Sequence, residues 1–118
     1  MRFVTSIVAA FAMLSLLTPE AVAHAILVRS TPKPHDVVAS GELNVSLEFN
    51  SRIDGARSSL TLISPGGKTE TLVLLPQPSP ASLAAKTSRL DAGSYSIRWQ
   101  VLANDGHISR GEIPFGVK

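Results

Sequence analysis

The sequence predicts an all-β domain, an immunoglobulin-like Greek-key β-sandwich or barrel of about seven strands. Two observations support this fold class: apolar and polar residues alternate with a period of two, and turns rich in Gly and Pro separate the alternating segments at short, regular spacing. Helical patterning is poor. The chain has 118 residues, 44% of them apolar and 17% charged, and no Cys, which fits one small domain without disulfides or thiolate zinc sites.

The clearest strand is expected at 43–49, where apolar residues at every second position share one face. Pro65, Gly66 and Gly67 are typical turn residues and predict a hairpin between 59–63 and 68–75. The Pro-rich stretch 76–80 is expected to form a stiff surface loop, and the short helix candidate 79–87 starts inside it. The remaining strands are expected at 25–29, 95–101 and 113–117.

A tyrosine at the start of a predicted strand adds support for an immunoglobulin-like sandwich. Tyr95 follows Gly93 by two residues, as in a tyrosine corner, where the hydroxyl bonds a backbone group. Phe49, Trp99 and Phe115 fall, like Tyr95, on positions predicted to face inward. No aromatic surface is therefore expected to be left for stacking on a ligand.

Residues 1–23 have the layout of a cleaved secretory signal peptide. Arg2 is followed by an uncharged stretch at 3–17, then by Pro19 and by small residues at 21 and 23. The stretch is shorter than the roughly 18 to 20 apolar residues of a spanning helix. We therefore predict cleavage after Ala23, a mature domain of residues 24–118 in the periplasm, and no membrane insertion after cleavage. The net charge of +2 is slight and the basic residues are scattered, so no nucleic-acid partner is expected.

Histidines occur only at positions 24, 35 and 107. His24 would be the first residue of the mature chain, so its α-amine and its Nδ1 could close a six-membered chelate on one metal ion. The reference pKa of an α-amine is about 7.7 to 8.0, so a metal displaces its proton at modest cost near neutral pH. His35 is expected to be a solvated loop residue.

The run Asn104-Asp105-Gly106-His107 supplies the other candidate ligands. In an extended chain Asp105 and His107 would point the same way, with Gly106 leaving the space between them open. With the His24 chelate they would make three nitrogens and one oxygen in a plane, a tetragonal set that favours Cu(II). The same run is also typical of a plain hairpin turn with no metal, and both interpretations stay open on the residues alone.

Several segments resemble the CopC family of periplasmic copper-resistance proteins. The resemblance covers nearly all of residues 24–118 and is weakest from 66 to 86. Its most specific feature is the pairing of an N-terminal His with a Trp-containing strand that leads into Asp-Gly-His. The segments that carry it are the start from His24 to Pro32, the strand at 43–49, the run 93–99, the Asp105 to His107 motif and the run 111–117.

This resemblance implies one Cu(II) ion bound by the amine and imidazole of His24 together with Asp105 and His107. It also implies a role in carrying or buffering copper, often beside an inner-membrane copper transporter of the CopD type. Some members hold Cu(I) in a Met-rich loop, but no Met follows Met13 here, so a Cu(II)-only site is expected. Certain members have an acidic residue near the copper, where this chain has Asn50 and Ser51.

The leading hypothesis is a copper-binding protein for sequestration, delivery or resistance, and not an enzyme. One alternative is a metal-free immunoglobulin-like structural or adhesion module. A less favoured alternative is a copper oxygenase with a histidine brace, as in polysaccharide monooxygenases. The inward aromatic positions leave no platform for a polymer, and no Gly-x-Ser-x-Gly elbow indicates nucleophilic catalysis.

Overall fold

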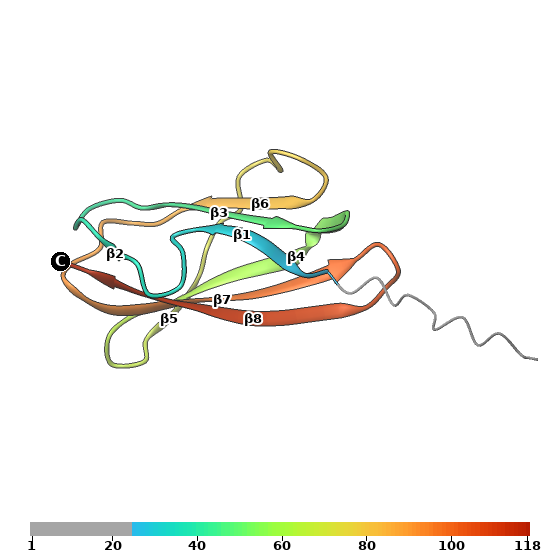
Figure 1. Cartoon of the computed structure of the whole chain (residues 1–118). Coiled ribbons are helices and arrows are strands. Elements are labelled where there is room, and N and C mark those ends of the chain that lie inside the picture. Colours follow the sequence, from blue (N-terminus) through green and yellow to red (C-terminus); the bar gives the residue numbers. More distant parts are fainter. Residues whose placement is uncertain (1–24) are drawn as a thin grey trace, which may run out of the picture.

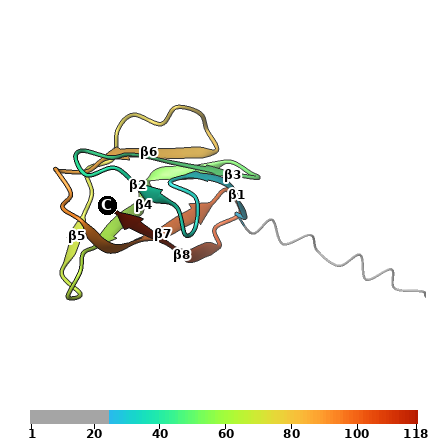
Figure 2. The same ribbon diagram turned by 60° about the vertical axis from the view of Figure 1, so that its left-hand side comes forward.

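The computed structural model describes residues 25–118, which form two β-sheets packed on each other (Figure 1). Figure 2 shows the same two layers from another side. The three-stranded sheet has the order β1 (Leu27–Thr31), β3 (Asn44–Phe49) and β6 (Ser82–Lys86). The five-stranded sheet has the order β2 (Val37–Val38), β8 (Ile108–Val117), β7 (Gly93–Ala103), β4 (Ile53–Ile63) and β5 (Thr69–Thr71).

The predicted all-β sandwich is confirmed, with eight strands in place of about seven. Neighbouring strands are antiparallel except β2 and β8, which run parallel. Residues 25–118 contain no helix, and hence no helical segment that could cross a membrane. The predicted signal peptide lies outside the described residues.

Strand β3 shows why the period of two predicted the fold. Val45, Leu47 and Phe49 are buried, whereas the residues between them are exposed. Burying one such side chain stabilises the fold by roughly 1.5 to 3 kcal/mol. Both sheets contribute to the core, and its most deeply buried side chains include Val45, Leu47, Leu60, Leu83, Ile97 and Ile113.

The aromatic residues lie inside the sandwich, as predicted. The Tyr95 hydroxyl donates to the Asp91 carbonyl at 2.8 Å, which is the expected tyrosine corner. The Phe49 and Trp99 rings meet edge to face with centroids 5.2 Å apart. Phe115 stacks on Tyr95 at 5.7 Å, so all four rings described in residues 25–118 fill the core.

Two elements differ from the prediction. The helix candidate at 79–87 is instead strand β6, which pairs with β3 and buries Leu83 and Ala85. Ala favours helices in isolation, but pairing with a central strand overrides this weak local preference. The hairpin closed by Gly66 and Gly67 is confirmed, with both glycines at a φ of 87°. Its second strand, however, spans only Thr69–Thr71.

Candidate metal centre

The turn between β7 and β8 carries two of the predicted ligands. Strand pairing runs down to Leu102 and Ile108, so residues 103–107 close the hairpin. The Ala103 N–H donates to the His107 carbonyl at 2.8 Å, and the Gly106 N–H donates to the Ala103 carbonyl at 3.0 Å. Gly106 has a φ of 86°, a conformation that glycine adopts without steric cost. The run therefore forms a hairpin turn, which is the conformation that one of the two interpretations predicted.

The same turn brings Asp105 and His107 into direct contact. The His107 backbone N–H donates to Asp105 Oδ1 at 3.0 Å, and His107 Nδ1 lies 3.1 Å from Asp105 Oδ2. The prediction that an extended chain aligns the two side chains is wrong, because residues 104–106 form a turn. A hairpin turn and a close pairing of Asp105 with His107 are thus compatible in this run.

These contacts define the electrostatics of the pair. The pKa of Asp105 is lowered from its ordinary value of 3.8, first because the His107 backbone N–H donates to the carboxylate, and further because of the His107 side chain. Asp105 is therefore an anion at neutral pH. The side-chain contact joins this carboxylate to Nδ1 of the His107 ring. The His107 side chain is 56% exposed, so it is accessible from solvent.

The start of the described chain is held at the same end of the sandwich. Ala25 is 3% exposed and belongs to the core. The Ile26 N–H donates to Asn50 Oδ1 at 2.8 Å, and the Ile26 carbonyl accepts from the Asn50 N–H at 3.0 Å. His24, the third predicted ligand residue, directly precedes Ala25 and lies outside the described residues.

The connection between β3 and β4, residues 50–52, joins the N-terminal segment to the β7–β8 turn. Asn50 bonds Ile26, and the Arg52 carbonyl accepts from the Asn104 N–H at 3.2 Å. Figure 1 shows the start of β1, this connection and the β7–β8 turn together at one end of the sandwich. The N-terminal segment and the β7–β8 turn are therefore both hydrogen-bonded to residues 50–52.

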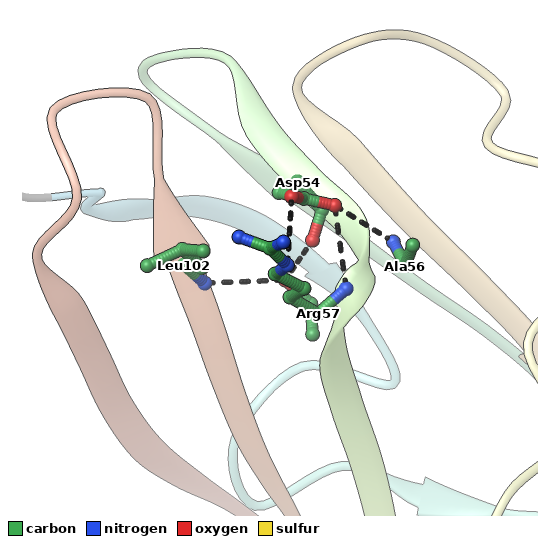
Figure 3. A network of polar contacts seen from close by, with 5 residues as sticks. Asp54, Ala56, Arg57 and Leu102 are labelled. Carbon is green, nitrogen blue, oxygen red and sulfur yellow. Dashed lines mark hydrogen bonds and ion pairs between the residues drawn. The ribbon is translucent and has the colours of Figure 1, made fainter.

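A bulge in β4 supports the strand that leads into the turn (Figure 3). Asp54 Oδ1 accepts from the backbone N–H groups of Ala56 and Arg57, at 3.0 and 3.3 Å. The buried Ser58 hydroxyl donates to the Asp54 carbonyl at 2.5 Å and accepts from the Leu102 N–H at 3.2 Å. The end of β7, one residue before the turn begins, is thereby fixed to β4.

The described residues include two of the three predicted ligand residues. Within 25–118 no three His, Cys, Asp or Glu side chains cluster closely enough to hold an ion. Asp105 and His107 offer one oxygen and one nitrogen, so a four-donor site of the predicted kind needs His24. His35 lies elsewhere: its N–H bonds the Pro114 carbonyl, seven residues along β8 from His107, or roughly 23 Å at strand spacing.

Asn50 and Arg52 were not identified as site-supporting residues from the sequence. Asn50 was noted only as a replacement for an acidic residue, and its bonds to Ile26 join positions 24 residues apart. An Asn just after an alternating strand is an ordinary turn signal. Nothing local in the sequence indicates which distant backbone group its side chain would bind.

The chain belongs to the CopC family, because the family model described as the CopC domain matches residues 27–118. Copper resistance protein C of Pseudomonas syringae pv. tomato is 30% identical over 131 residues, covering 97% of this chain and 96% of that protein. Protein YobA of Escherichia coli strain K12 is 29% identical over 109 residues, covering 88% and 86% respectively. The resemblance found in the sequence is therefore confirmed.

Solved structures agree with this assignment. CopC from Methylosinus trichosporium OB3b superposes with a TM-score of 0.73 and 33% identity, covering 80% of this chain and 94% of that one. PcoC, a methionine-rich copper resistance protein from Escherichia coli, gives a TM-score of 0.66 and 26% identity, covering 81% and 100%. The present chain is not methionine-rich, since its two Met residues are Met1 and Met13.

Proposed function

We propose that this protein binds one Cu(II) ion at the end of the sandwich where the β7–β8 turn and the start of β1 meet. The ligands are the α-amine and imidazole of His24, the carboxylate of Asp105 and the imidazole of His107. The observation that carries the proposal is the contact between Asp105 and His107, which presents an anionic oxygen beside a ring nitrogen on an accessible turn.

The position of Ala25 supports a contribution from His24. Consecutive Cα atoms are about 3.8 Å apart, so residue 24 directly adjoins a buried core residue. Ile26 is tied to residue 50, and residue 52 to Asn104, the neighbour of Asp105. A set of three nitrogens and one carboxylate oxygen suits Cu(II), which also heads the affinity order among divalent first-row ions.

Copper is the cargo in this proposal, and the protein is a carrier and not a catalyst. Residues 1–23 direct export to the periplasm, and their removal after Ala23 frees the His24 amine. The protein sequesters Cu(II) or delivers it, with an inner-membrane CopD-like transporter as its partner. A Cu(I) site built on methionine is not part of the proposal, because no Met follows position 13 and Cu(I) favours soft sulfur ligands.

The test starts from the mass of the exported protein, which should correspond to residues 24–118. A variant with one Gly before His24, whose retained extension is verified by mass, moves the amine out of the chelate. We expect this variant to bind Cu(II) more weakly than the native form. The loss of affinity should exceed the roughly 10 to 100-fold that is typical when a residue supporting a metal ligand is removed.

Titration with Cu(II) measures this difference, and Zn(II) is the comparison ion. Equal Cu(II) affinity of the extended and native forms would rule out the amine as a ligand. No Cu(II) binding by the native exported form would favour the metal-free structural module.

A further inference from the structure

We propose that Asn50 is a positioning residue of the copper site. Its carboxamide holds the chain at Ile26 so that His24, two residues earlier, meets the turn that carries Asp105 and His107. This inference rests on the proposed function. It assigns a purpose to an exposed side chain that was not predicted to hold the N-terminal segment.

Asn50 and Ile26 form a residue pair in which one of the two usual backbone hydrogen bonds is replaced by a side-chain bond. In an antiparallel ladder, two facing residues exchange two backbone N–H to carbonyl bonds. Here the Asn50 N–H donates to the Ile26 carbonyl, as expected for such a pair. The return bond from the Ile26 N–H goes to the side-chain Oδ1 of Asn50. Holding Ile26 from both sides therefore requires a side chain at position 50 that accepts a hydrogen bond.

The Ile26 side chain itself does little to fix the chain. The Ile26 side chain is 60% exposed, and β1 begins only at Leu27. The β1–β3 register is irregular between Leu27 and Arg29, so the ladder itself is imperfect there. The two bonds to Asn50 act together with the burial of Ala25 and the pairing of Leu27 with Phe49 to direct this segment.

A short path of bonds connects Ile26 with the turn that carries Asp105 and His107. Arg52 follows Asn50 by two residues, at most about 7 Å in extended chain, and its carbonyl accepts from the Asn104 N–H. Asn104 is followed directly by Asp105. Ile26 and Asn104 are thus tied to the two ends of one three-residue segment, residues 50–52. Loss of the Asn50 acceptor removes one of the two bonds at Ile26 and leaves the bond between Arg52 and Asn104 intact.

Three substitutions test the proposal in the exported protein. Asn50→Leu has a similar shape and no acceptor, whereas Asn50→Asp keeps an oxygen where Oδ1 lies. Asn44→Leu is the matched control, because Asn44 is an exposed residue at the opposite end of β3. In copper-free protein, hydrogen exchange of the Ile26 amide should be faster in Asn50→Leu and unchanged in Asn44→Leu.

Copper binding provides the second measurement. Asn50→Leu should bind Cu(II) about 10-fold more weakly, the lower end of the loss seen when a partner that orients a ligand is removed. Its electron paramagnetic resonance spectrum should show a mixture of copper species. Asn50→Asp keeps the acceptor and should lose none of the affinity, and Asn44→Leu should match the native protein in affinity and spectrum.

The outcomes separate this inference from the proposed function. Native protein that binds Cu(II) through His24, together with an Asn50→Leu variant of unchanged affinity and spectrum, would overturn the positioning role alone. An equal loss of affinity in Asn50→Asp and Asn50→Leu would also overturn it, because the acceptor would then not matter. Absence of Cu(II) binding by the native protein would overturn the proposed function and, with it, this role of Asn50.

Discussion

The carboxylate of Asp105 accepts the backbone N–H of His107 and also lies against the ring of the same residue. The first contact measures 3.0 Å to Oδ1 and the second 3.1 Å between Oδ2 and Nδ1. One turn thereby fixes the rotamer of the carboxylate and the orientation of the imidazole together. Ligands arranged before the metal arrives need little reordering when it binds.

The pKa of Asp105 in copper-free protein should lie below 3.8, because the His107 backbone N–H stabilises the carboxylate. His107→Ala keeps this main cause and removes the ring, so the pKa should rise only part of the way back. Carbon NMR titration of the side-chain carboxyl measures both values. An unshifted pKa in the native protein, or a full return to 3.8 in His107→Ala, would contradict the geometry.

The lowered pKa of Asp105 makes the stability of the fold depend on pH. The folded-state pKa lies below the unfolded value, so ionised Asp105 stabilises the fold above the ordinary carboxyl range. This contribution is lost as the pH falls through the lower, folded-state pKa. Asp105→Asn should therefore remove part of the acid dependence of stability below about pH 4, as measured by urea unfolding at a series of pH values.

Replacing single histidines separates the proposed ligand from the remote one. His107→Ala should remove a nitrogen coupling from the electron paramagnetic resonance spectrum of the Cu(II) form and weaken binding. His35→Ala should leave both unchanged, because His35 is attached to the middle of β8 at Pro114. If His35→Ala altered the spectrum and His107→Ala did not, the assignment of the site would be wrong.

Gly111 in β8 lies under the ring of Trp99. A Cβ at this position would come within 2.5 to 2.8 Å of three ring atoms, and the ring is buried against Phe49. Gly111→Ala should lower the free energy of unfolding by about 1 to 3 kcal/mol, the usual cost of overpacking. Urea unfolding followed by tryptophan fluorescence measures the loss.

Gly116→Ala is the control for this substitution. Gly116 lies in the same strand, and an added Cβ would make an ordinary contact at 3.7 Å with Val37. Its effect should be much smaller than that of Gly111→Ala. Similar losses in the two variants would show that a general property of glycine in β8, and not the Trp99 contact, decides the stability.

Two serine hydroxyls, those of Ser51 and Ser96, are buried without a hydrogen-bond partner in the described part of the chain. A buried, unsatisfied polar group costs about 1 to 3 kcal/mol. Ser51→Ala and Ser96→Ala should each therefore raise the free energy of unfolding of copper-free protein. Urea unfolding checks this, and a clear fall in stability for either variant would show that its hydroxyl has a partner.

The strands that pack on the core were the most predictable part of the fold. In β3 every second side chain must face the other sheet, so the alternation from Leu43 to Phe49 fixes both the strand and its buried face. Strand β6 was missed because Ser82–Lys86 carries Ala84 and Ala85 after a Pro-rich stretch. Its strand conformation comes from pairing with β3, which is a tertiary effect.

The candidate site was predictable in composition and less so in geometry. Asp105 and His107 stood out because this chain has so few residues able to bind a metal. Their contact depends on the positive φ of Gly106 and on closure of the hairpin, which replaces the extended arrangement that was expected. The role of Asn50 could not be predicted, because its partner Ile26 is brought to it only by the pairing of β1 with β3.

The burial of Ala25 has a consequence for the order of events during export. A peptidase must hold several residues on each side of the scissile bond in extended form. If the leader is cut after Ala23, the second residue beyond the cut is Ala25, whose side chain is already part of the core. In that case processing has to come before the sandwich closes at this end, and the proposed capture of copper comes last, after translocation, cutting and folding.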